Sequence, residues 1–277
     1  MHMKNLIMSL IAVSTTCFAS AFDVVAHRGE FSLAPENTLE AFSLAWKNGA
    51  KYVEGDFHMN SEGEILVFHT ESDLRRIWNI NKKARELTID DVKKSNLKGN
   101  PRWSAKFPNS RIPTIDEVFK IIPKDAVLVL EIKTFGKGYV EKVEELRKAN
   151  GLSYDNILLI SFAKKPIAEF KAKFPKYKAL WLYVVKAAKD GSLSPSAEEA
   201  ISVCREINAD GVDIGNVGDP KCPKIDGEYV EAFKKAGLAF WVWTEDNLNT
   251  IPFYKKLGVD GVTTNKSSEM LKYLENR

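Results

Sequence analysis

The stretch AVLVLEIK, residues 126–133, is followed by VEKVEELRKA at residues 140–149 and by NILLIS at residues 156–161. The first and third segments are short aliphatic runs typical of buried strands. The middle segment carries apolar residues three or four positions apart, as an amphipathic helix does. Alternation of this kind predicts parallel strands with the helices packed outside them.

The same alternation continues from Phe22 to the end of the chain. Eight apolar runs predict strands, at residues 23–27, 52–57, 126–132, 156–161, 179–183, 211–214, 239–243 and 259–263. Helical patterns lie between them, for example at residues 39–47, 140–149, 196–207, 228–236 and 251–257. Eight strand–helix repeats in a chain of this length predict a closed (β/α)8 TIM barrel, which takes roughly 250 residues, rather than an open doubly wound sheet. Neither a glycine-rich dinucleotide motif nor a P-loop follows the first run.

One stretch breaks this regularity after the second strand unit. A further apolar run, residues 65–69, is followed by the polar residues 70–111, which have helical character only at residues 89–97. Such a stretch is too long for an ordinary strand-to-helix loop, and long loops of this kind in barrels usually cover the active-site face. We therefore predict one barrel domain over residues 22–277, with residues 70–111 as a small insertion.

Composition excludes several classes of function. The 277 residues are 44% hydrophobic and 28% charged, near the average for globular proteins. The 40 basic and 37 acidic residues give a formal charge of +3, so no global basic field predicts nucleic acid or an anionic membrane as a partner. Three cysteines are too few for a disulfide scaffold, and none is spaced as in a zinc site.

Residues 1–21 have the pattern of a secretory signal peptide. A short segment with one histidine and one lysine, residues 1–4, precedes a mostly apolar run at residues 6–18, and Ala19-Ser20-Ala21 provides a cleavage site. The run is too short to stay behind as a membrane-spanning anchor. We expect a periplasmic or secreted protein; the alternative is a frayed or membrane-tethered N-terminal helix. In an oxidising compartment Cys204 and Cys222 either pair or remain buried thiols.

Acidic side chains at the carboxyl ends of two predicted strands indicate a metal site, because barrel active sites lie at that end. Glu54 and Asp56 are two positions apart and therefore share one face of their strand, and Glu131 ends another strand. Three carboxylates at one barrel mouth repel one another unless a cation neutralises them, and oxygen ligands suit Mg²⁺ or Ca²⁺. The structural alternative is that Glu131 pairs with Lys133 while the other two carboxylates cap loops.

Two histidines, His27 and His69, end apolar runs beside these carboxylates. A histidine at a strand end is more often a satisfied buried side chain than a catalyst. Two of them flanking an acidic metal site nevertheless suit phosphoryl transfer, which needs an acid and a base near neutral pH. A further histidine, His58, shares the face of Glu54 and Asp56 by alternation; it is expected at a solvent-contacting rim, and the alternative is a partner that supports the site from behind.

Several short motifs follow one another along the chain in a recognisable order. They are His27-Arg28-Gly29, residues 34–42, Glu54-Gly55-Asp56, residues 67–69, residues 111–118, Glu131-Ile132-Lys133, Val242-Trp243-Thr244 and residues 258–264. In this order they closely resemble the glycerophosphodiester phosphodiesterase family over essentially the whole chain after residue 21. The resemblance implies a (β/α)8 barrel with an insertion after the second strand unit, which is where residues 70–111 fall.

The resemblance also implies roles for the matching residues. Glu54, Asp56 and Glu131 are expected to bind one divalent cation, Ca²⁺ or Mg²⁺, and export slightly favours Ca²⁺, which is abundant outside cells. His27 and His69 are expected to form the acid–base pair on either side of the phosphorus.

Further residues are expected to complete the pocket. Arg28 and Lys133 would hold the phosphate oxygens. Glu36 and Asn37 would order the first loop, and Asn37 with Glu40 also fits a helix N-cap with its capping box. Trp243 is expected to wall the pocket, although a plain core aromatic is the alternative.

Two positions depart from the family pattern. The family usually has Asp after the second histidine, where this chain has Thr70, so the orientation of that histidine depends on a substitute such as Glu71. The usual Trp-Thr-x-Asn ends in Asp246 here, and a carboxylate at that place could favour a cationic alcohol as the headgroup.

The function implied by the resemblance is hydrolysis of a small-molecule glycerophosphodiester to an alcohol and glycerol 3-phosphate. The same parts also fit a phospholipase-D-like or phospholipase-C-like barrel acting on intact phospholipid. That interpretation needs an apolar surface near the mouth, which Trp78, Trp103 and Phe107 could supply; the alternative is that they pack the insertion onto the barrel. A third alternative is a degenerate barrel that binds phosphodiesters without catalysis, which only Thr70 supports.

Overall fold

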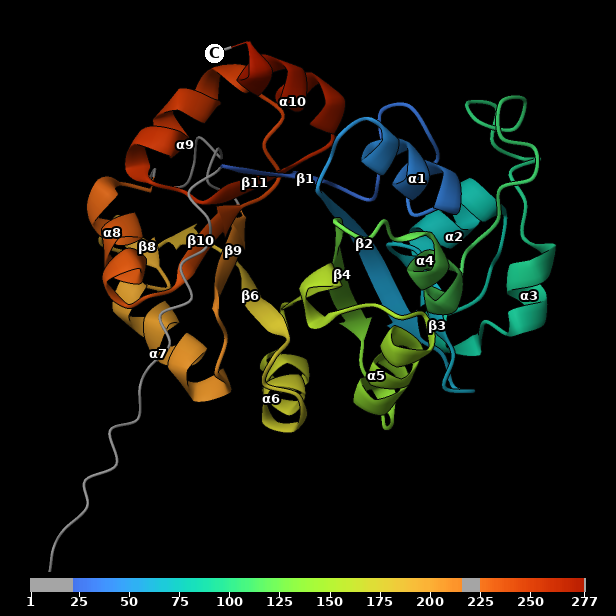
Figure 1. Ribbon diagram of the computed structural model, residues 1–277, viewed down its shortest axis with the longest axis horizontal. Helices are drawn as coiled ribbons and strands as arrows, with labels where there is room; N and C mark the ends of the chain where they lie inside the picture. The colour runs from blue at the N-terminus through green and yellow to red at the C-terminus, as the bar shows by residue number, and fades with distance from the viewer. Residues whose placement is uncertain (1–21, 216–224, 277) are drawn as a thin grey trace, which may run out of the picture.

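A computed structural model describes residues 22–215 and 225–276, and it has the architecture of a closed barrel (Figure 1). The eight parallel strands are β1 (Asp23–Ala26), β2 (Tyr52–Met59), β4 (Val127–Thr134), β5 (Ile157–Ser161), β6 (Lys178–Val184), β9 (Gly211–Gly215), β10 (Ala239–Val242) and β11 (Gly261–Thr264). Each strand pairs with the next, and β1 pairs with both β2 and β11, which closes the ring. The predicted (β/α)8 barrel is therefore confirmed.

Helices follow the strands and cover the outside of the barrel. They are α1 (Leu39–Lys47), α4 (Ile115–Ile121), α5 (Tyr139–Ala149), α6 (Lys164–Lys173), α7 (Ala197–Ile207), α8 (Gly227–Lys235), α9 (Ile251–Leu257) and α10 (Ser267–Glu275). Two single 3₁₀ turns, η2 (Tyr154–Asn156) and η3 (Leu248–Thr250), precede β5 and α9, and the short strands β7 (Lys186–Ala187) and β8 (Leu193–Ser194) form a hairpin. None of the helices in the described ranges is long and apolar enough to cross a membrane.

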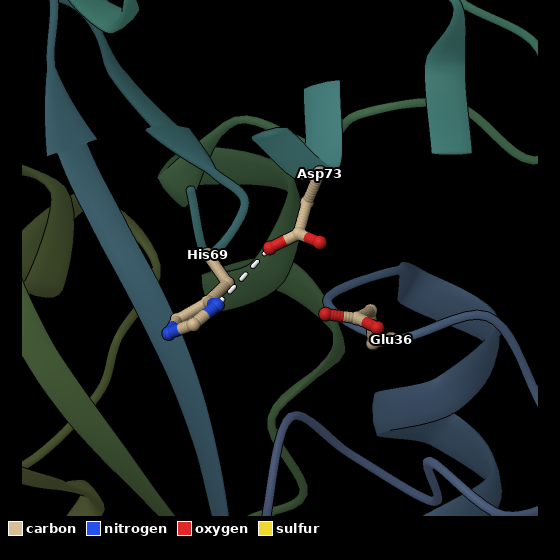
Figure 2. A group of neighbouring side chains, drawn as sticks. All are labelled: Glu36, His69 and Asp73. Carbon is tan, nitrogen blue, oxygen red and sulfur yellow. Dashed lines mark hydrogen bonds and ion pairs between the residues drawn. The ribbon is translucent and has the colours of Figure 1, made fainter. Parts of the chain in front are cut away.

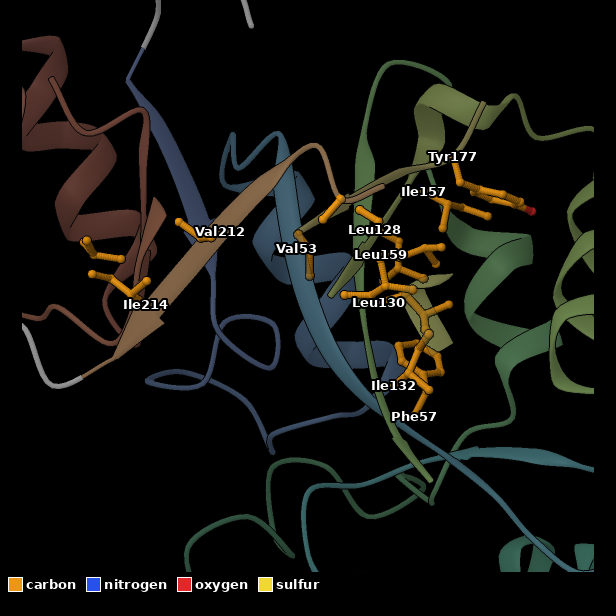
Figure 3. Packing of buried hydrophobic residues seen from close by; sticks show 14 of the residues in the cluster. Val53, Phe57, Leu128, Leu130, Ile132, Ile157, Leu159, Tyr177, Val212 and Ile214 are labelled. Carbon is orange, nitrogen blue, oxygen red and sulfur yellow. The ribbon is translucent and has the colours of Figure 1, made fainter. Parts of the chain in front are cut away.

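The pleat of the strands decides which side chains reach the site. Along β4, Leu128 and Leu130 point outward into the main core between strands and helices (Figure 3). Val127 and Val129 belong instead to a smaller cluster inside the barrel. Because side chains alternate with a period of two, Glu131 faces the barrel interior at the carboxyl end of β4.

The insertion follows a short antiparallel strand, β3 (Ile65–Val67), which pairs with the end of β2. It contains α2 (Glu71–Trp78), a 3₁₀ turn η1 (Ala84–Glu86) and α3 (Ile89–Lys94). The expectation of helical character only at residues 89–97 was wrong, because α2 lies in the stretch read as irregular. Its sequence ESDLRRIW is polar enough to hide a short apolar stripe.

That stripe packs into a separate hydrophobic cluster, here called the insertion core. The insertion core comprises Leu66, Phe68, Leu74, Ile77, Trp78, Ala84, Leu87, Val92, Leu97 and Ile112. Trp103 and Phe107 pack against it from the edge. The three aromatics suggested as a lipid-binding surface therefore pack the insertion together, and Trp78 is only 4% exposed.

Candidate active site

A cavity of about 330 Å³ opens at the carboxyl ends of the strands. Its walls come from most strands of the barrel and consist of His27, Arg28, Glu54, His69, Glu131, Lys133, Ile160, Phe162, Leu182, Asp213, Trp243, Thr244 and Thr263. Seven of the eight side chains singled out from the sequence thus line one cavity. The eighth, Asp56, is buried beside it and is 1% exposed.

The three carboxylates lie together at one side of this cavity, with Glu54 and Glu131 in its wall and Asp56 behind them. Asp56 and Glu131 are register partners on β2 and β4, and each of the three residues places a carboxylate oxygen within 4.8 Å of the others. All three side chains are buried. One oxygen of Glu54, Oε1, has no hydrogen-bond partner among the described residues. An all-oxygen set with an unpartnered buried carboxylate oxygen fits a hard divalent cation.

Charge repulsion and burial shift the pKa values of these carboxyls. Burial, together with Asp56 and Glu131, holds the pKa of Glu54 well above its usual range. Burial and the neighbouring Asp56 raise the pKa of Glu131 to about 7. Burial alone would raise the pKa of Asp56 too, but Lys133 and Arg28 lower it below its usual range. The site without a cation therefore holds protons that a bound cation has to displace.

Two positively charged side chains, those of Lys133 and Arg28, lie among the carboxylates. The Lys133 ammonium lies 3.1 Å from Asp56 Oδ1 and 2.6 Å from Glu131 Oε1. Arg28 has a φ of 55°, its backbone N–H donates to Glu54 Oε2 at 2.8 Å, and its guanidinium lies 3.4 Å from Asp56 Oδ2. Both cationic side chains therefore border the cavity next to the three carboxylates.

His27 directly follows β1 and lies next to Glu54. Its Nε2 is 4.0 Å from Glu54 Oε2, and its Nδ1 is 2.7 Å from Asn265 Oδ1. Enclosure in the site and the neighbouring Arg28 lower the pKa of His27 to about 4. The imidazole is therefore neutral at physiological pH and able to accept a proton.

His69 is held by a carboxylate that the sequence analysis missed. Its Nδ1 lies 3.0 Å from Asp73 Oδ2 (Figure 2). The same Asp73 oxygen accepts from the Thr70 hydroxyl at 2.6 Å. The expected substitute, Glu71, instead accepts from the backbone N–H of Ala84, so that expectation was wrong. The signal was available: Thr70 caps α2, and a carboxylate four residues after His69 then lies on the same side.

Glu36 joins His69 and Asp73 in a second group whose ligand atoms lie within 4.8 Å of one another (Figure 2). Both carboxylates are already paired, however. Arg28 donates to Glu36 at 2.9 Å, and Arg76 donates to Glu36 at 3.1 Å and to Asp73 at 2.7 Å. This arrangement orders the loop and the histidine, and we assign no cation to it.

Two further expectations were wrong. His58 is 9% exposed rather than at a rim, because β3 covers it; its ring stacks on Phe68 and its Nε2 lies 3.1 Å from the His69 carbonyl oxygen. Asn37 does not cap α1, since Thr38 does so. The Asn37 amide instead donates to Asp56 Oδ2 at 2.7 Å and accepts from the Asp56 N–H at 3.0 Å.

The far wall of the cavity is aromatic and contains one more acid. Trp243 packs edge-on against Phe162, with ring centroids 5.6 Å apart, and its indole N–H donates to the Asp213 carbonyl at 3.2 Å. The Asp213 carboxyl is buried, and its Oδ1 has no partner within the described ranges. Burial raises the pKa of Asp213 well above its usual range. No motif marked this residue in the sequence.

Known proteins are similar to this chain in both sequence and fold. Residues 27–269 match the glycerophosphoryl diester phosphodiesterase family. A glycerophosphodiester phosphodiesterase of Caldanaerobacter subterraneus is 29% identical over 252 residues, which cover 90% of this chain and 96% of that protein.

Solved structures agree with this match. A Thermotoga maritima glycerophosphodiester phosphodiesterase is 25% identical, with a TM-score of 0.68 over 91% of this chain and 98% of that one. An Oleispira antarctica phosphodiesterase, solved in complex with the product sn-glycerol-3-phosphate, is 23% identical and has a TM-score of 0.75 over 91% of this chain and 96% of that one.

Proposed function

Since this chain belongs to the glycerophosphoryl diester phosphodiesterase family, we propose that it hydrolyses glycerophosphodiesters to an alcohol and glycerol 3-phosphate. It is an enzyme, a phosphoric diester hydrolase. One observation supports the assignment most: two histidines, two cationic side chains and a cluster of three carboxylates gather around a single cavity at the carboxyl end of the barrel. The product complex of the Oleispira antarctica relative supports the same substrate class.

The residues that would hold the divalent cation are Glu54, Asp56 and Glu131. A bound cation supplies a Lewis acid that offsets charge on the phosphoryl oxygens. Lys133 and Arg28 add positive charge on the same side and would contact the phosphate oxygens directly. The all-oxygen ligands suit Ca²⁺ and Mg²⁺ alike, and we favour Ca²⁺ on the ground of the proposed export.

The protons are moved by the histidines in this proposal. One histidine takes the proton of the attacking hydroxyl, which belongs either to water or to the glycerol C2 position, in which case a cyclic phosphate forms. The other gives a proton to the oxygen of the leaving alcohol. Trp243 and Phe162 wall the cavity on the far side, and they limit the water that reaches the phosphorus.

Two alternatives lose their support in this arrangement. A phospholipase acting on intact bilayers needs an apolar surface, but Trp78 is buried and Trp103 and Phe107 pack on the insertion core. A non-catalytic binder rested on Thr70, whose hydroxyl instead caps α2 and donates to Asp73.

We also propose that the protein is exported. Residues 1–21, like Cys222, lie outside the described residues, so this rests on the signal-peptide pattern alone. Mass spectrometry of protein recovered from outside the cytoplasm should give a mature chain starting near Phe22. Exported protein that still carries Met1 would refute cleavage. Cys204 is buried on α7, and its pairing with Cys222 stays a prediction.

The experiment that tests the function measures glycerol 3-phosphate release from glycerophosphocholine by the purified chain, with and without a chelator. We expect turnover that the chelator abolishes and that added Ca²⁺ or Mg²⁺ restores. Phosphatidylcholine vesicles serve as the competing substrate and should react far more slowly. No turnover of any diester under metal-loaded conditions would favour the binder, and chelator-resistant turnover would refute the metal.

A further inference from the structure

Behind His27 lies a hydrogen-bonded chain of two more side chains, from the segments that follow β11 and β10. Asn265 Oδ1 is 2.7 Å from His27 Nδ1, and Asn265 Nδ2 donates to Asp246 Oδ2 at 2.9 Å. The other Asp246 oxygen accepts from the Asn265 backbone N–H at 2.8 Å and from the Thr264 hydroxyl at 2.9 Å. Both carboxylate oxygens of Asp246 are therefore used inside this chain.

These contacts, and the absence of Asp246 from the described residues that line the cavity, give no support to the selection of a cationic headgroup that its charge suggested. The wall of the cavity beside it is formed by Trp243 and Thr244. Its carboxylate points instead at the amide that contacts the histidine.

Only one assignment of donors and acceptors is consistent along the hydrogen bonds that link Asp246, Asn265 and His27. A carboxylate accepts hydrogen bonds and cannot donate them, so Asn265 has to turn its NH₂ group toward Asp246. The amide oxygen then faces His27 and can only accept, so His27 Nδ1 has to carry the proton. In the neutral ring, Nε2 is consequently bare, and this is the nitrogen that lies beside Glu54 in the cavity.

We propose that Asp246, acting through Asn265, is a positioning residue that fixes the Nδ1–H form of His27 and makes its Nε2 the proton acceptor of the reaction. This rests on the proposed function. In the step itself, the O–H bond of the attacking hydroxyl breaks, its proton binds to Nε2, and the oxygen forms the new bond to phosphorus. His69 donates the proton that the leaving alcohol takes up as its bond to phosphorus breaks. The Asp246 carboxylate offsets the charge that His27 then carries.

The first test is Asp246→Asn. An amide at this place can present either its oxygen or its NH₂ group to Asn265, so the Asn265 amide is free to turn and the other tautomer of His27 becomes accessible. We expect kcat to fall about ten- to a hundred-fold, the usual cost of losing a group that orients a functional histidine, with KM nearly unchanged. Glu245→Gln removes the same charge one residue away, outside the chain, and should keep wild-type kinetics.

Exchanging the two residues tests the polarity itself. In Asn265→Asp alone, two carboxylates face each other and activity should fall. In the double variant Asp246→Asn/Asn265→Asp, the new amide donates to the new carboxylate, which accepts from His27 Nδ1–H as the original amide did. The double variant should therefore recover most of the kcat that each single variant loses. A purely structural or headgroup-selecting role predicts no such recovery.

A readout independent of turnover is ¹⁵N NMR of the histidine rings, with the His27 signals assigned by their loss in His27→Ala. Wild type and Glu245→Gln should show a protonated Nδ1 and a bare Nε2, and Asp246→Asn a mixture of tautomers. If Asp246→Asn does not fold, the double variant decides alone. Wild-type tautomer and kcat in Asp246→Asn, a KM change confined to choline-bearing diesters, or no recovery in the double variant would each overturn the proposal. An inactive wild type would refute the proposed function, and the NMR result would still decide this inference.

Discussion

His27 and His69 are anchored through the same ring nitrogen but by different groups. An uncharged amide faces Nδ1 of His27, and the Asp73 carboxylate faces Nδ1 of His69 directly. Neither a carboxylate nor an amide oxygen can donate a hydrogen bond, so Nδ1 carries the proton in both rings and Nε2 is the nitrogen left for the reaction. With His27 proposed as the proton acceptor, His69 is proposed as the proton donor of the reaction.

The first prediction follows from these roles. His27→Ala and His69→Ala should each lower kcat by about 10² to 10⁴, the usual contribution of a positioned proton carrier. With an aryl phosphodiester, whose leaving group departs without protonation, His69→Ala should recover most of the wild-type rate and His27→Ala should not.

The control is the double variant on a glycerophosphodiester. Because the two groups act in one step, it should lose far less than the product of the single losses. Wild-type rates in both single variants on alkyl diesters would rule out the two-histidine mechanism.

The second prediction concerns Glu131 as a metal ligand. Its pKa is raised to about 7 in the cation-free protein, so a cation competes with a proton below that pH. Calorimetric titration with Ca²⁺ should therefore show affinity that rises as the pH approaches and passes 7. Glu131→Gln should bind the cation more weakly and lose the part of this pH dependence that Glu131 contributes, while the part due to Glu54, whose pKa is also raised, remains. Undiminished affinity and chelator sensitivity in this variant would exclude Glu131 as a ligand.

Contacts between residues far apart in the sequence could not be predicted at the scale of single residues. Glu54, Asp56 and Glu131 were found because each lies on a strand whose alternation can be read locally. Asp213 and the Asn265 contact with His27 were not, because their meaning depends on closure of the ring, which brings residues 238 positions apart together.

At the scale of the elements, the strands were easier to predict than the helices. Buried parallel strands are continuous aliphatic runs, and all eight were located to within a few residues. α2 was missed because its exposed face is dominated by charged residues, and His58 was placed at a rim because the pairing of β3 onto β2 cannot be deduced from periodicity.

The third prediction concerns α5, where Glu144 accepts from Arg147 at 2.9 Å and from the Tyr177 hydroxyl at 2.9 Å. These hydrogen bonds, that of Arg147 first, lower the pKa of Glu144 to about 2. A folded-state pKa below the unfolded value means that the contribution to stability is present above the unfolded value and is lost as the pH falls toward 2. Glu144→Gln should therefore reduce the free energy of unfolding at pH 7 by about 1–3 kcal/mol, the cost of an unpaired buried group.

Urea unfolding of both proteins at several pH values checks this. The difference between wild type and Glu144→Gln should shrink steadily on acidification. A difference that stays constant down to the acid limit would show that the variant acts through packing instead. The exposed α5 residue Glu145 offers a control, since Glu145→Gln should have almost no effect at any pH.

For the whole molecule, the buried carboxylates predict that the cation stabilises the fold. They repel one another in its absence, and a ligand that binds only the folded state adds about 2.7 kcal/mol at a concentration a hundred times its Kd. Thermal unfolding should therefore shift upward with added Ca²⁺ or Mg²⁺ and revert with chelator. Asp56→Asn should show a much smaller shift. An equal shift in that variant would place the cation elsewhere.

The insertion core is separate from the main core, and α2, which packs into it, carries Asp73. His27 and the three clustered carboxylates belong to the barrel instead. Units with their own core can open on their own. Each such excursion would leave metal binding and the proton acceptor intact but deprive His69 of its carboxylate. The time that the insertion spends closed therefore scales kcat and leaves KM untouched. Hydrogen exchange at the α2 amides would measure the fraction of time that the insertion is closed.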